Sequence, residues 1–167
     1  MRKRDQEEFE RVFRSAYPAV LRTASLVLQD RGRAEEVTQG AFLRLYERWG
    51  RDVAFEQPEA WVRRIAVQGA IRRANHERAV PVVPMVDTRG ASDRLSDIDL
   101  LRAVGALPPR QRAAVALHYL EDLTVDQIAR LMEIAPGTVR QHLCKARARL
   151  VERLGEPLQQ EVSHVDR

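Results

Sequence analysis

The apolar residues of this chain recur at intervals of three and four, the spacing that places them on one face of an α-helix. In the first half, these positions are Phe9, Val12, Phe13 and Ala16, then Val20, Leu21, Ala24 and Leu28, then Ala34, Val37, Ala41 and Leu45, and finally Trp61, Val62, Ile65, Ala66 and Gly69. The strict alternation typical of strands is absent. The pattern therefore predicts an all-α fold.

Prolines, glycines and capping residues predict where these helices begin and end. Proline is tolerated in the first turn of a helix but not deeper, so we expect a break just before Pro18 and a new helix at Pro58. Asp30 is the expected N-cap of the helix that follows it. Gly50 is expected to end that helix, and residues 51–57 are expected to form a loop.

Residues 79–96 interrupt the helical pattern. They contain Pro81, Pro84 and Gly90 and show no helical period, which is typical of an extended linker. A connection of this length is unusual inside one compact domain. The chain is therefore predicted to form two small helical domains, residues 5–78 and 97–155, joined by the linker and followed by a polar, flexible tail over 156–167.

The second half resumes with a short helix expected from Asp97 to Ala106 and another that starts at Pro108 and Pro109. A further short apolar-periodic helix follows, then a tight turn and a longer helix from Pro136. Thr124, with Gln127 three residues later, has the spacing of a capping box at the start of the short helix. This order predicts a helix-turn-helix, which lays its second helix in the major groove of DNA.

The second helix of that motif separates apolar from basic residues. Val139, Leu143, Ala146 and Leu150 recur at helical spacing and are expected to pack inward. Arginine and lysine suit guanine edges and phosphates, and glutamine suits adenine. The candidate residues for duplex DNA are therefore Thr138, Arg140, Gln141, Cys144, Lys145 and Arg147. The alternative interpretation is an ordinary basic amphipathic helix on a solvated surface.

Composition narrows the remaining function classes. The formal net charge of +4 is modest, so the clustering of basic residues matters more than their sum. A single cysteine, Cys144, excludes an internal disulfide framework and a multi-cysteine zinc site. No signal peptide or membrane-spanning stretch is expected, which favours a cytoplasmic protein. The chain lacks a metal cluster, a nucleophile–base set and a phosphate-binding glycine loop, so we expect neither an enzyme nor a cofactor.

Several strings in this chain, taken in order, resemble sigma factors of the extracytoplasmic-function type, which belong to the sigma-70 superfamily of bacterial RNA polymerase. Each string alone is weak, and their order along nearly the whole chain makes the resemblance specific. The strings are Tyr17-Pro18 with Leu21-Arg22, the run from Ala34 to Tyr46, the run from Pro58 to Ala66, the run from Leu107 to Arg112, and Pro136 to Arg140. The resemblance implies a first sigma domain from Phe9 to Arg78 and a second from Asp97 to Gly155.

The resemblance implies a binding site for core RNA polymerase on the helix from Ala34 to Tyr46. In the family, this helix docks on the clamp helices of the polymerase large subunit. The residues that would make this contact here are Glu35, Glu36, Gln39 and Phe42. The alternative is that Phe42, Leu43 and Leu45 belong to the core, which is the favoured interpretation for Leu45.

The resemblance also implies a site for the melted minus-ten element. In the family, the loop matching residues 51–57 takes up a flipped non-template base, and Phe55 is the candidate stacking side chain. Gln68 would help to read the strand, and Arg63, Arg64, Arg72 and Arg73 would neutralise its phosphates. A solvated basic helix face is the alternative for these arginines, and Trp49 and Trp61 are expected to be core anchors.

Five positions depart from the family pattern. Gln68 replaces a frequent asparagine, Arg72 a usual aspartate, and His142 and Lys145 frequent arginines. Gly40 replaces a common glutamate on the polymerase-binding helix, and glycine there lowers helix stability by roughly 1 kcal/mol. We expect these changes to alter sequence preference and one polymerase contact.

Together these features predict an alternative sigma factor. Its helix-turn-helix would bind the minus-thirty-five element as duplex DNA, its first domain would recognise and melt the minus-ten element, and an anti-sigma factor would regulate it. One rival is a stand-alone helix-turn-helix repressor or activator whose N-terminal half is a dimerisation module. Another is an interaction module that occupies polymerase without initiating transcription.

Overall fold

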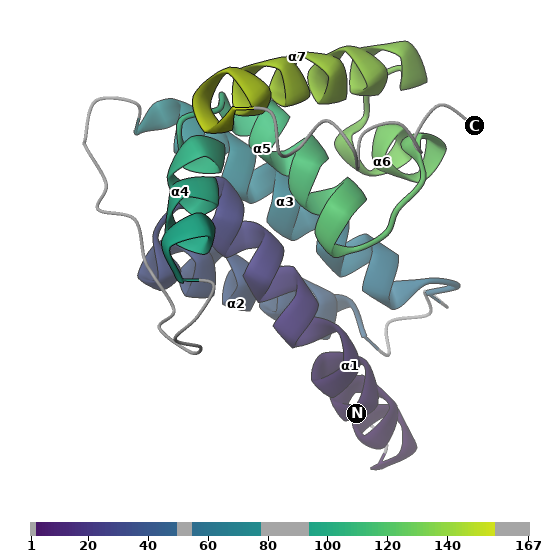
Figure 1. The fold of residues 1–167 in the computed structure, drawn as a ribbon. Helices are drawn as coiled ribbons and strands as arrows, with labels where there is room; N and C mark the ends of the chain where they lie inside the picture. The colour runs from purple at the N-terminus through teal and green to yellow at the C-terminus, as the bar shows by residue number, and fades with distance from the viewer. Residues whose placement is uncertain (1–2, 50–54, 78–93, 156–167) are drawn as a thin grey trace.

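The computed structural model describes residues 3–49, 55–77 and 94–155, and all regular structure within them is helical (Figure 1). The elements are α1 (Lys3–Leu28), α2 (Arg31–Arg48), α3 (Pro58–His76), α4 (Arg94–Gly105), α5 (Pro109–Val115), the π-helical η1 (Ala116–Leu120), α6 (Val125–Met132) and α7 (Pro136–Leu154). The predicted all-α fold class is confirmed. Most of the predicted linker, the tail over 156–167 and Gly50 lie outside the described residues.

The predicted helix starts agree closely with the structure. Asp30 caps α2, because its carboxylate accepts a hydrogen bond from the backbone N–H of Arg33 at 2.9 Å. Thr124 and Gln127 form both hydrogen bonds of the capping box at the start of α6. One start differs: α4 begins at Arg94, inside the predicted linker, whereas the sequence placed it at Asp97.

The predicted break before Pro18 is wrong, because α1 runs through this residue without interruption. A proline inside a helix removes one backbone hydrogen bond and destabilises the helix by about 3 kcal/mol. Here Ala16 and Val20, on either side of it, are buried in the core that α1 forms with α2 and α3. Tertiary packing of both halves therefore outweighs the local effect of the proline.

The first three helices pack on one another as a unit. Val20 of α1, Leu45 of α2 and Val62 of α3 are completely buried at their common core. Partly buried aromatic residues extend this core toward the start of α1, among them Phe9, Tyr17, Trp49, Phe55 and Trp61. The expected anchoring role of Trp49 and Trp61, and the core position of Leu45, are confirmed.

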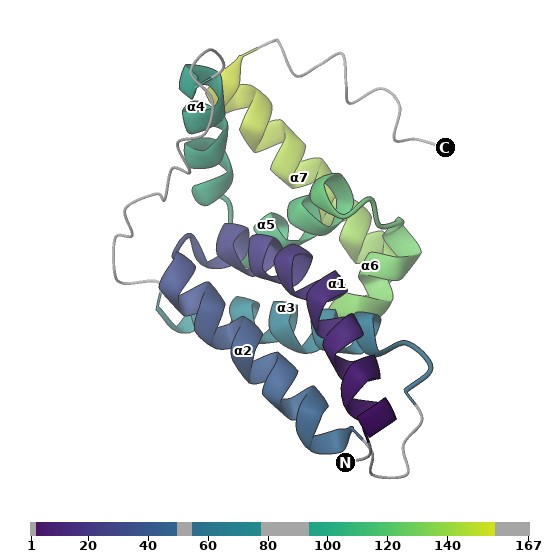
Figure 2. The same ribbon diagram turned by 90° about the horizontal axis from the view of Figure 1, so that it is seen from below.

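Helices α4 to α7 form a second unit, and it packs directly against the first. One continuous apolar core joins Val27 of α1 and Val67 of α3 to Leu117 of η1 and Leu143 of α7. Figures 1 and 2 show α7 on the side of the second unit that faces away from α2. Helices α5 and α6 and the segment η1 lie between, in contact with the first unit. The domain boundaries expected from the sequence stay a prediction.

Candidate nucleic-acid interface

The helix-turn-helix is built by α6, a three-residue turn and α7. Glu133 leaves α6 in the left-handed conformation, with φ 57° and ψ 44°, and the N–H of Ile134 then bonds the carbonyl of Ala129 at 3.0 Å. Pro136 occupies the first turn of α7, where its missing N–H carries no penalty. This turn sets the direction of α7 relative to α6.

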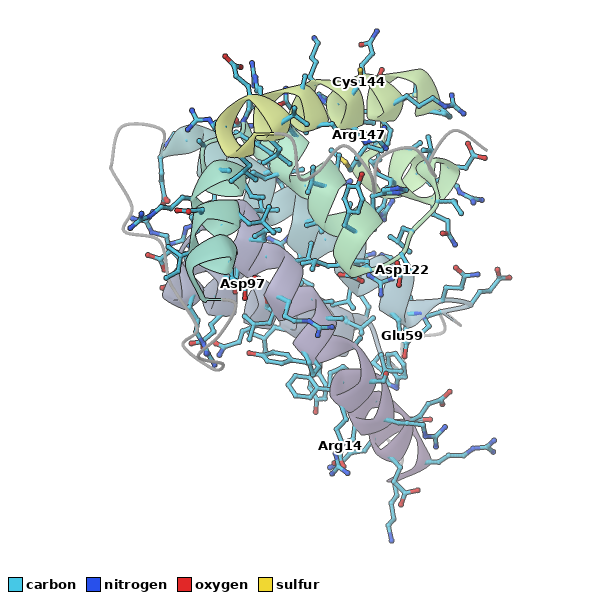
Figure 3. The ribbon with its side chains drawn as sticks, viewed as in Figure 1. Arg14, Glu59, Asp97, Asp122, Cys144 and Arg147 are labelled. Carbon is cyan, nitrogen blue, oxygen red and sulfur yellow. The ribbon has the colours of Figure 1, made fainter. Side chains whose placement is uncertain are left out.

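The predicted division of α7 into an inner and an outer face is confirmed. Val139, Leu143, Ala146 and Leu150 are buried. Four of the candidate DNA-binding residues are exposed on the opposite face, and Figure 3 shows Cys144 on the side of α7 that points away from the molecule. These four are Arg140, Gln141, Cys144 and Lys145. Their side chains are accessible to a binding partner such as a DNA duplex.

Two of the predicted residues on α7 differ from the others. Thr138 is half-buried in the first turn of the helix. Arg147 is half-buried and donates a hydrogen bond from Nε to the phenol oxygen of Tyr119 at 3.1 Å. Arg147 therefore lies on the flank of α7 that faces η1, outside the row formed by the four exposed residues.

The predicted minus-ten residues on α3 meet the second unit. Arg63 forms an ion pair with Glu121, with 2.6 Å between Nε and Oε2. Arg64 forms another with Glu133, with 3.2 Å between Nη1 and Oε1. Gln68 donates from Nε2 to the carbonyl oxygen of Leu131 at 3.3 Å. In this arrangement of the helices, Arg63 and Arg64 are thus paired with carboxylates of the second unit, and their role at the minus-ten element stays a prediction.

The other two predicted minus-ten residues lie apart from these contacts. Arg72 is exposed. Phe55 is half-buried and stacks on Trp49, with their ring centroids 5.9 Å apart and the rings 14° from parallel. The ring centroid of Phe55 also lies 5.6 Å from that of Trp61, with the two rings at 62° to each other. Phe55 thus has an aromatic surface beside it, and residues 51–54 of the same loop lie outside the described part of the chain.

The predicted polymerase-binding residues on α2 divide into exposed and buried ones. Glu36 and Gln39 are exposed, and Glu35 is half-buried and paired with Arg31. Phe42 is only 3% exposed, so its predicted availability to a partner is wrong. Its ring packs against Phe13 and Tyr17 of α1, with centroids 4.9 and 5.6 Å apart. Phe42 is buried because its ring packs against aromatic residues of α1. The sequence of α2 alone does not show these partners.

Sequence reasoning missed two exposed side chains on the same helix. Leu43 is 63% exposed and Tyr46 is 46% exposed, so α2 presents apolar and aromatic surface among its polar residues. Leu43 follows Glu36 and Gln39 at helical intervals of seven and four. That spacing places Leu43 on the same face of α2 as Glu36 and Gln39. The spacing is the signal from which the exposed position of Leu43 could have been predicted.

Charged side chains hold the start of α2 to the end of α3. Arg73 forms ion pairs with Glu36 at 2.6 Å and with Glu77 at 3.2 Å, and Glu77 also pairs with Arg33 at 2.6 Å. The hydrogen bond that Arg73 donates to the carboxylate of Glu36 is the main reason that the pKa of Arg73 is raised above its ordinary value. Arg73 is therefore engaged within the first unit.

Two other kinds of site, a metal centre and a membrane-spanning helix, are absent from the part of the chain that the structure describes. Within residues 3–49, 55–77 and 94–155, no three histidine, cysteine, aspartate or glutamate side chains are grouped so that they could hold a metal ion. Among the same residues, no helix has the length and apolar character needed to cross a bilayer.

Comparison with known proteins agrees with both units. The family model for sigma-70 region 2 matches residues 12–80, and the model for sigma-70 region 4 matches residues 97–150. The chain is 32% identical over 155 residues to the RNA polymerase sigma-E factor of Streptomyces coelicolor, covering 88% of this chain and 86% of that protein. It is 29% identical over 155 residues to the ECF RNA polymerase sigma factor SigM of Mycobacterium tuberculosis, covering 90% of this chain and 79% of that protein.

A solved structure has the same fold. It is the sigma factor RpoE of Bartonella quintana, crystallised with the anti-sigma factor NepR. The TM-score is 0.66 at 18% identity, and the match covers 89% of this chain and 97% of that one. The family matches and the relatives span both helical units. This chain therefore belongs to the sigma-70 family and is an alternative RNA polymerase sigma factor of the extracytoplasmic-function type.

Proposed function

We propose that this sigma factor binds core RNA polymerase through α2, places α7 on the minus-thirty-five element, and uses α3 with Phe55 to recognise and melt the minus-ten element. The observation that carries the proposal is the exposed row of Arg140, Gln141, Cys144 and Lys145 on the second helix of a well-formed helix-turn-helix. The chain acts in the cytoplasm and supplies no catalytic group, since the polymerase carries out RNA synthesis.

On the minus-thirty-five element, the four exposed residues of α7 enter the major groove. Arg140 and Lys145 suit guanine edges, and Gln141 suits adenine. Thr138 lies in the first turn of α7, where hydroxyl and backbone N–H groups bind phosphate oxygens. Arg147 contributes a phosphate contact from the flank of the helix, because its hydrogen bond to Tyr119 holds it outside the row.

On the minus-ten element, the bases of the non-template strand leave the stack and need new contacts. Unstacking costs a few kcal/mol, and stacking on an aromatic side chain contributes about 1–3 kcal/mol per base. Phe55, with Trp49 and Trp61 beside it, provides such a surface. Arg63, Arg64 and Arg72 neutralise phosphates of the separated strand, and the amide of Gln68 reads a base edge.

On the polymerase, the exposed face of α2 docks on the clamp helices of the large subunit. Glu35, Glu36 and Gln39 form the polar part of this surface, and Leu43 and Tyr46 take the apolar role that the sequence assigned to Phe42. An apolar centre with a charged rim is typical of protein interfaces. An anti-sigma factor that covers such surfaces would regulate this protein, as the complex of RpoE with NepR illustrates for a protein of the same fold.

Run-off transcription tests the proposal directly. Purified core polymerase is incubated with a genomic promoter library, with and without this protein, and the transcripts are sequenced. We expect new start sites that share two upstream elements. A stand-alone repressor or activator would instead bind a palindromic duplex tightly without polymerase, and an interaction module would bind polymerase without creating any start site.

A further inference from the structure

The two flanks of α7 lie beside different residues. His142 and Arg149 are separated by two helical turns, so they share one flank. On that flank, Arg149 donates a hydrogen bond from Nη1 to Oε1 of Gln111 in α5 at 3.1 Å. Arg147 lies on the other flank and donates to the phenol oxygen of Tyr119. Helix α7 therefore has α5 beside one flank and η1 beside the other.

His142 lies in positively charged surroundings on the α5 flank. The imidazole is half-buried, and Arg110 of α5 and Lys145 of α7 are both exposed. Burial is the main cause that lowers the pKa of His142, and the charges of Arg110 and Lys145 lower it further. Within the described part of the chain, neither Arg110 nor Lys145 takes part in an ion pair. Two permanent cations and one titratable group thus lie near one another.

The other charged side chains around α7 do not balance this positive charge. On α5, Arg112 donates from Nη1 to the carbonyl oxygens of Gly105 and Leu107 at 2.8 and 2.9 Å. The remaining charged residues on α7 and on the helices packed against it are Arg140, Arg147, Arg149, Glu152 and Arg153 of α7, Asp126 and Arg130 of α6, Glu133 after α6, and Asp97, Asp99 and Arg102 of α4. None of these is among the causes of the lowered pKa of His142. The group of Arg110, His142 and Lys145 therefore suits an anion from outside the chain.

The position of this group corresponds to a strand of the duplex when α7 lies in the major groove. A helix with its side chains is about 10–12 Å across, and the groove is about 12 Å wide. The outer row of a helix that fills the groove faces the base edges, and its two flanks face the two phosphate backbones. The proposed function already places one phosphate beside Arg147. His142 and Arg110 lie on the opposite flank, which faces the other strand.

We propose that Arg110 and His142 form a binding site for one phosphate of duplex DNA, and that His142 takes up a proton when this phosphate binds. The proton comes from solvent and goes to the unprotonated ring nitrogen, so that the imidazolium N–H donates to a phosphate oxygen. The guanidinium group of Arg110 binds the same phosphate. Lys145, at the border of the outer row, adds positive charge beside it. This inference rests on the proposed function of α7.

Phosphate binding reverses the balance of charge at His142. In the free protein, burial and two neighbouring cations oppose protonation of the imidazole. A bound phosphate supplies negative charge and a hydrogen-bond acceptor, so the pKa of His142 is higher in the complex than in the free protein. The gain in affinity is fully present below the pKa of the free protein and is lost as the pH rises through the pKa of the complex. Duplex affinity therefore increases on acidification.

The first test measures the binding of the full-length protein to a fluorescent duplex at low salt, from about pH 6 to about pH 8. The duplex carries the minus-thirty-five element of a promoter found by run-off transcription. We expect wild type to bind about tenfold more tightly at the lower pH. His142→Gln should lose this dependence, and His142→Arg should keep the tighter affinity throughout because its guanidinium does not titrate. The control, His76→Gln, removes an exposed histidine at the end of α3 and should behave as wild type.

The second test measures how duplex affinity depends on salt. A protein releases counterions for each phosphate that it neutralises, so Arg110→Gln should reduce the slope of log affinity against log salt by about one. The loss should be equal on the minus-thirty-five duplex and on a scrambled duplex, since a phosphate contact carries no sequence information. The control, Arg44→Gln, changes net charge equally at an exposed position of α2 and should keep the wild-type slope.

The third test follows the imidazole signal of His142 by NMR during pH titration of the free protein, of its complex with the duplex, and of the protein with inorganic phosphate at the same concentration as the duplex. We expect the duplex to raise the pKa of His142 and inorganic phosphate to leave it unchanged. Equal effects of both would overturn the inference, because the site would then bind a free anion rather than the DNA backbone.

Two further results would overturn the inference while promoter recognition stays intact. One is the same pH dependence of duplex affinity in wild type and His142→Gln, and the other is a wild-type salt slope in Arg110→Gln. A different result would overturn the proposed function. In that case wild type would bind the minus-thirty-five duplex no more tightly than the scrambled one at any pH, and core polymerase would start no new transcripts in its presence. The two failures are therefore distinguishable.

Discussion

Arg147 donates a hydrogen bond from Nε to the phenol oxygen of Tyr119, with 3.1 Å between the two atoms. The contact ties α7 to the end of η1, beside an apolar groove that Leu100 and Leu120 also line. Helical spacing alone grouped Arg147 with Arg140 as residues that read bases. The hydrogen bond separates them, because it holds one guanidinium on the flank of α7 while the other is exposed on its outer face.

This difference predicts unequal effects on promoter recognition. Arg140→Ala should weaken binding to the minus-thirty-five duplex by about 1–3 kcal/mol and relax the preference at one base pair. Arg147→Ala should weaken binding to all sequences equally, since a phosphate contact carries no sequence information. Fluorescence anisotropy on duplexes with single base-pair changes measures both effects. Relaxed base preference in Arg147→Ala would contradict the geometry.

Two buried threonines allow a matched test of the contact between the units. Thr23 and Thr38 are both completely buried in helices, but only the hydroxyl of Thr23 has a partner, the carboxylate of Glu121. The hydroxyl of Thr38 has no hydrogen-bond partner among the described residues. Valine has almost the same shape as threonine and lacks the hydroxyl, so the two substitutions isolate the hydrogen bond.

Thr23→Val should lower the free energy of unfolding by about 1–3 kcal/mol, because it leaves an oxygen of a buried carboxylate unsatisfied. Thr38→Val should leave the stability unchanged or raise it slightly, since it removes a buried polar group that has no partner. Urea denaturation of both variants measures the difference. Equal effects would mean that the hydroxyl of Thr23 does not stabilise the contact between the units.

The sequence predicts most of the fold because its helix signals are local. Asp30, Thr124 and Pro58 act on the first turn of their own helices, and all three have the predicted position. Pro18 fails as a signal because its effect depends on distant residues that bury Ala16 and Val20. The spacing of apolar residues likewise does not predict that the second unit packs on the first. A buried apolar residue has the same spacing in the sequence whether it contacts its own unit or the other one.

The candidate site follows the same rule. The outer face of α7 could be predicted because helical spacing alone decides which residues oppose Val139 and Leu143. The state of Phe42 and of Arg63 depends on partners from α1 and from the second unit. No local pattern encodes those partners. The sequence therefore predicts Phe42 on the surface, where it does not lie, and predicts that Arg63 faces solvent or DNA.

Gly40 lies in the middle of α2, and a Cβ added there would meet no atom within 4 Å. Glycine within a helix is less stable than alanine by roughly 0.5–1 kcal/mol because it loses more backbone freedom on folding. Gly40→Ala should therefore raise the free energy of unfolding by about that amount. Gly69→Ala is the comparison, because its Cβ would lie 3.3 Å from Cγ1 of Val37, so the same helical gain is reduced or reversed. Thermal unfolding measures both, and equal gains would show that the α2–α3 contact tolerates a methyl group.

His142 makes the stability of the helix-turn-helix depend on pH. Burial is the main cause that lowers the pKa of this imidazole, and the positive charges of Arg110 and Lys145 add to the shift. The unfolded chain, with a histidine pKa of about 6.5, then binds the proton more readily than the folded protein. Stability that is fully present above that pH is therefore lost as the pH falls toward the lowered pKa of the folded state.

The predicted slope can be measured by urea denaturation between neutral and mildly acidic pH. The wild-type protein should become less stable on acidification within this window, and His142→Gln should lose less, because glutamine keeps a polar side chain that does not titrate. Carboxylates contribute a background slope at lower pH that both proteins share, so the difference between them isolates the histidine. Wild type and His142→Gln could instead lose stability in parallel from neutral pH downward. That result would mean that folding does not lower the pKa of His142 and that the charges of Arg110 and Lys145 do not affect it.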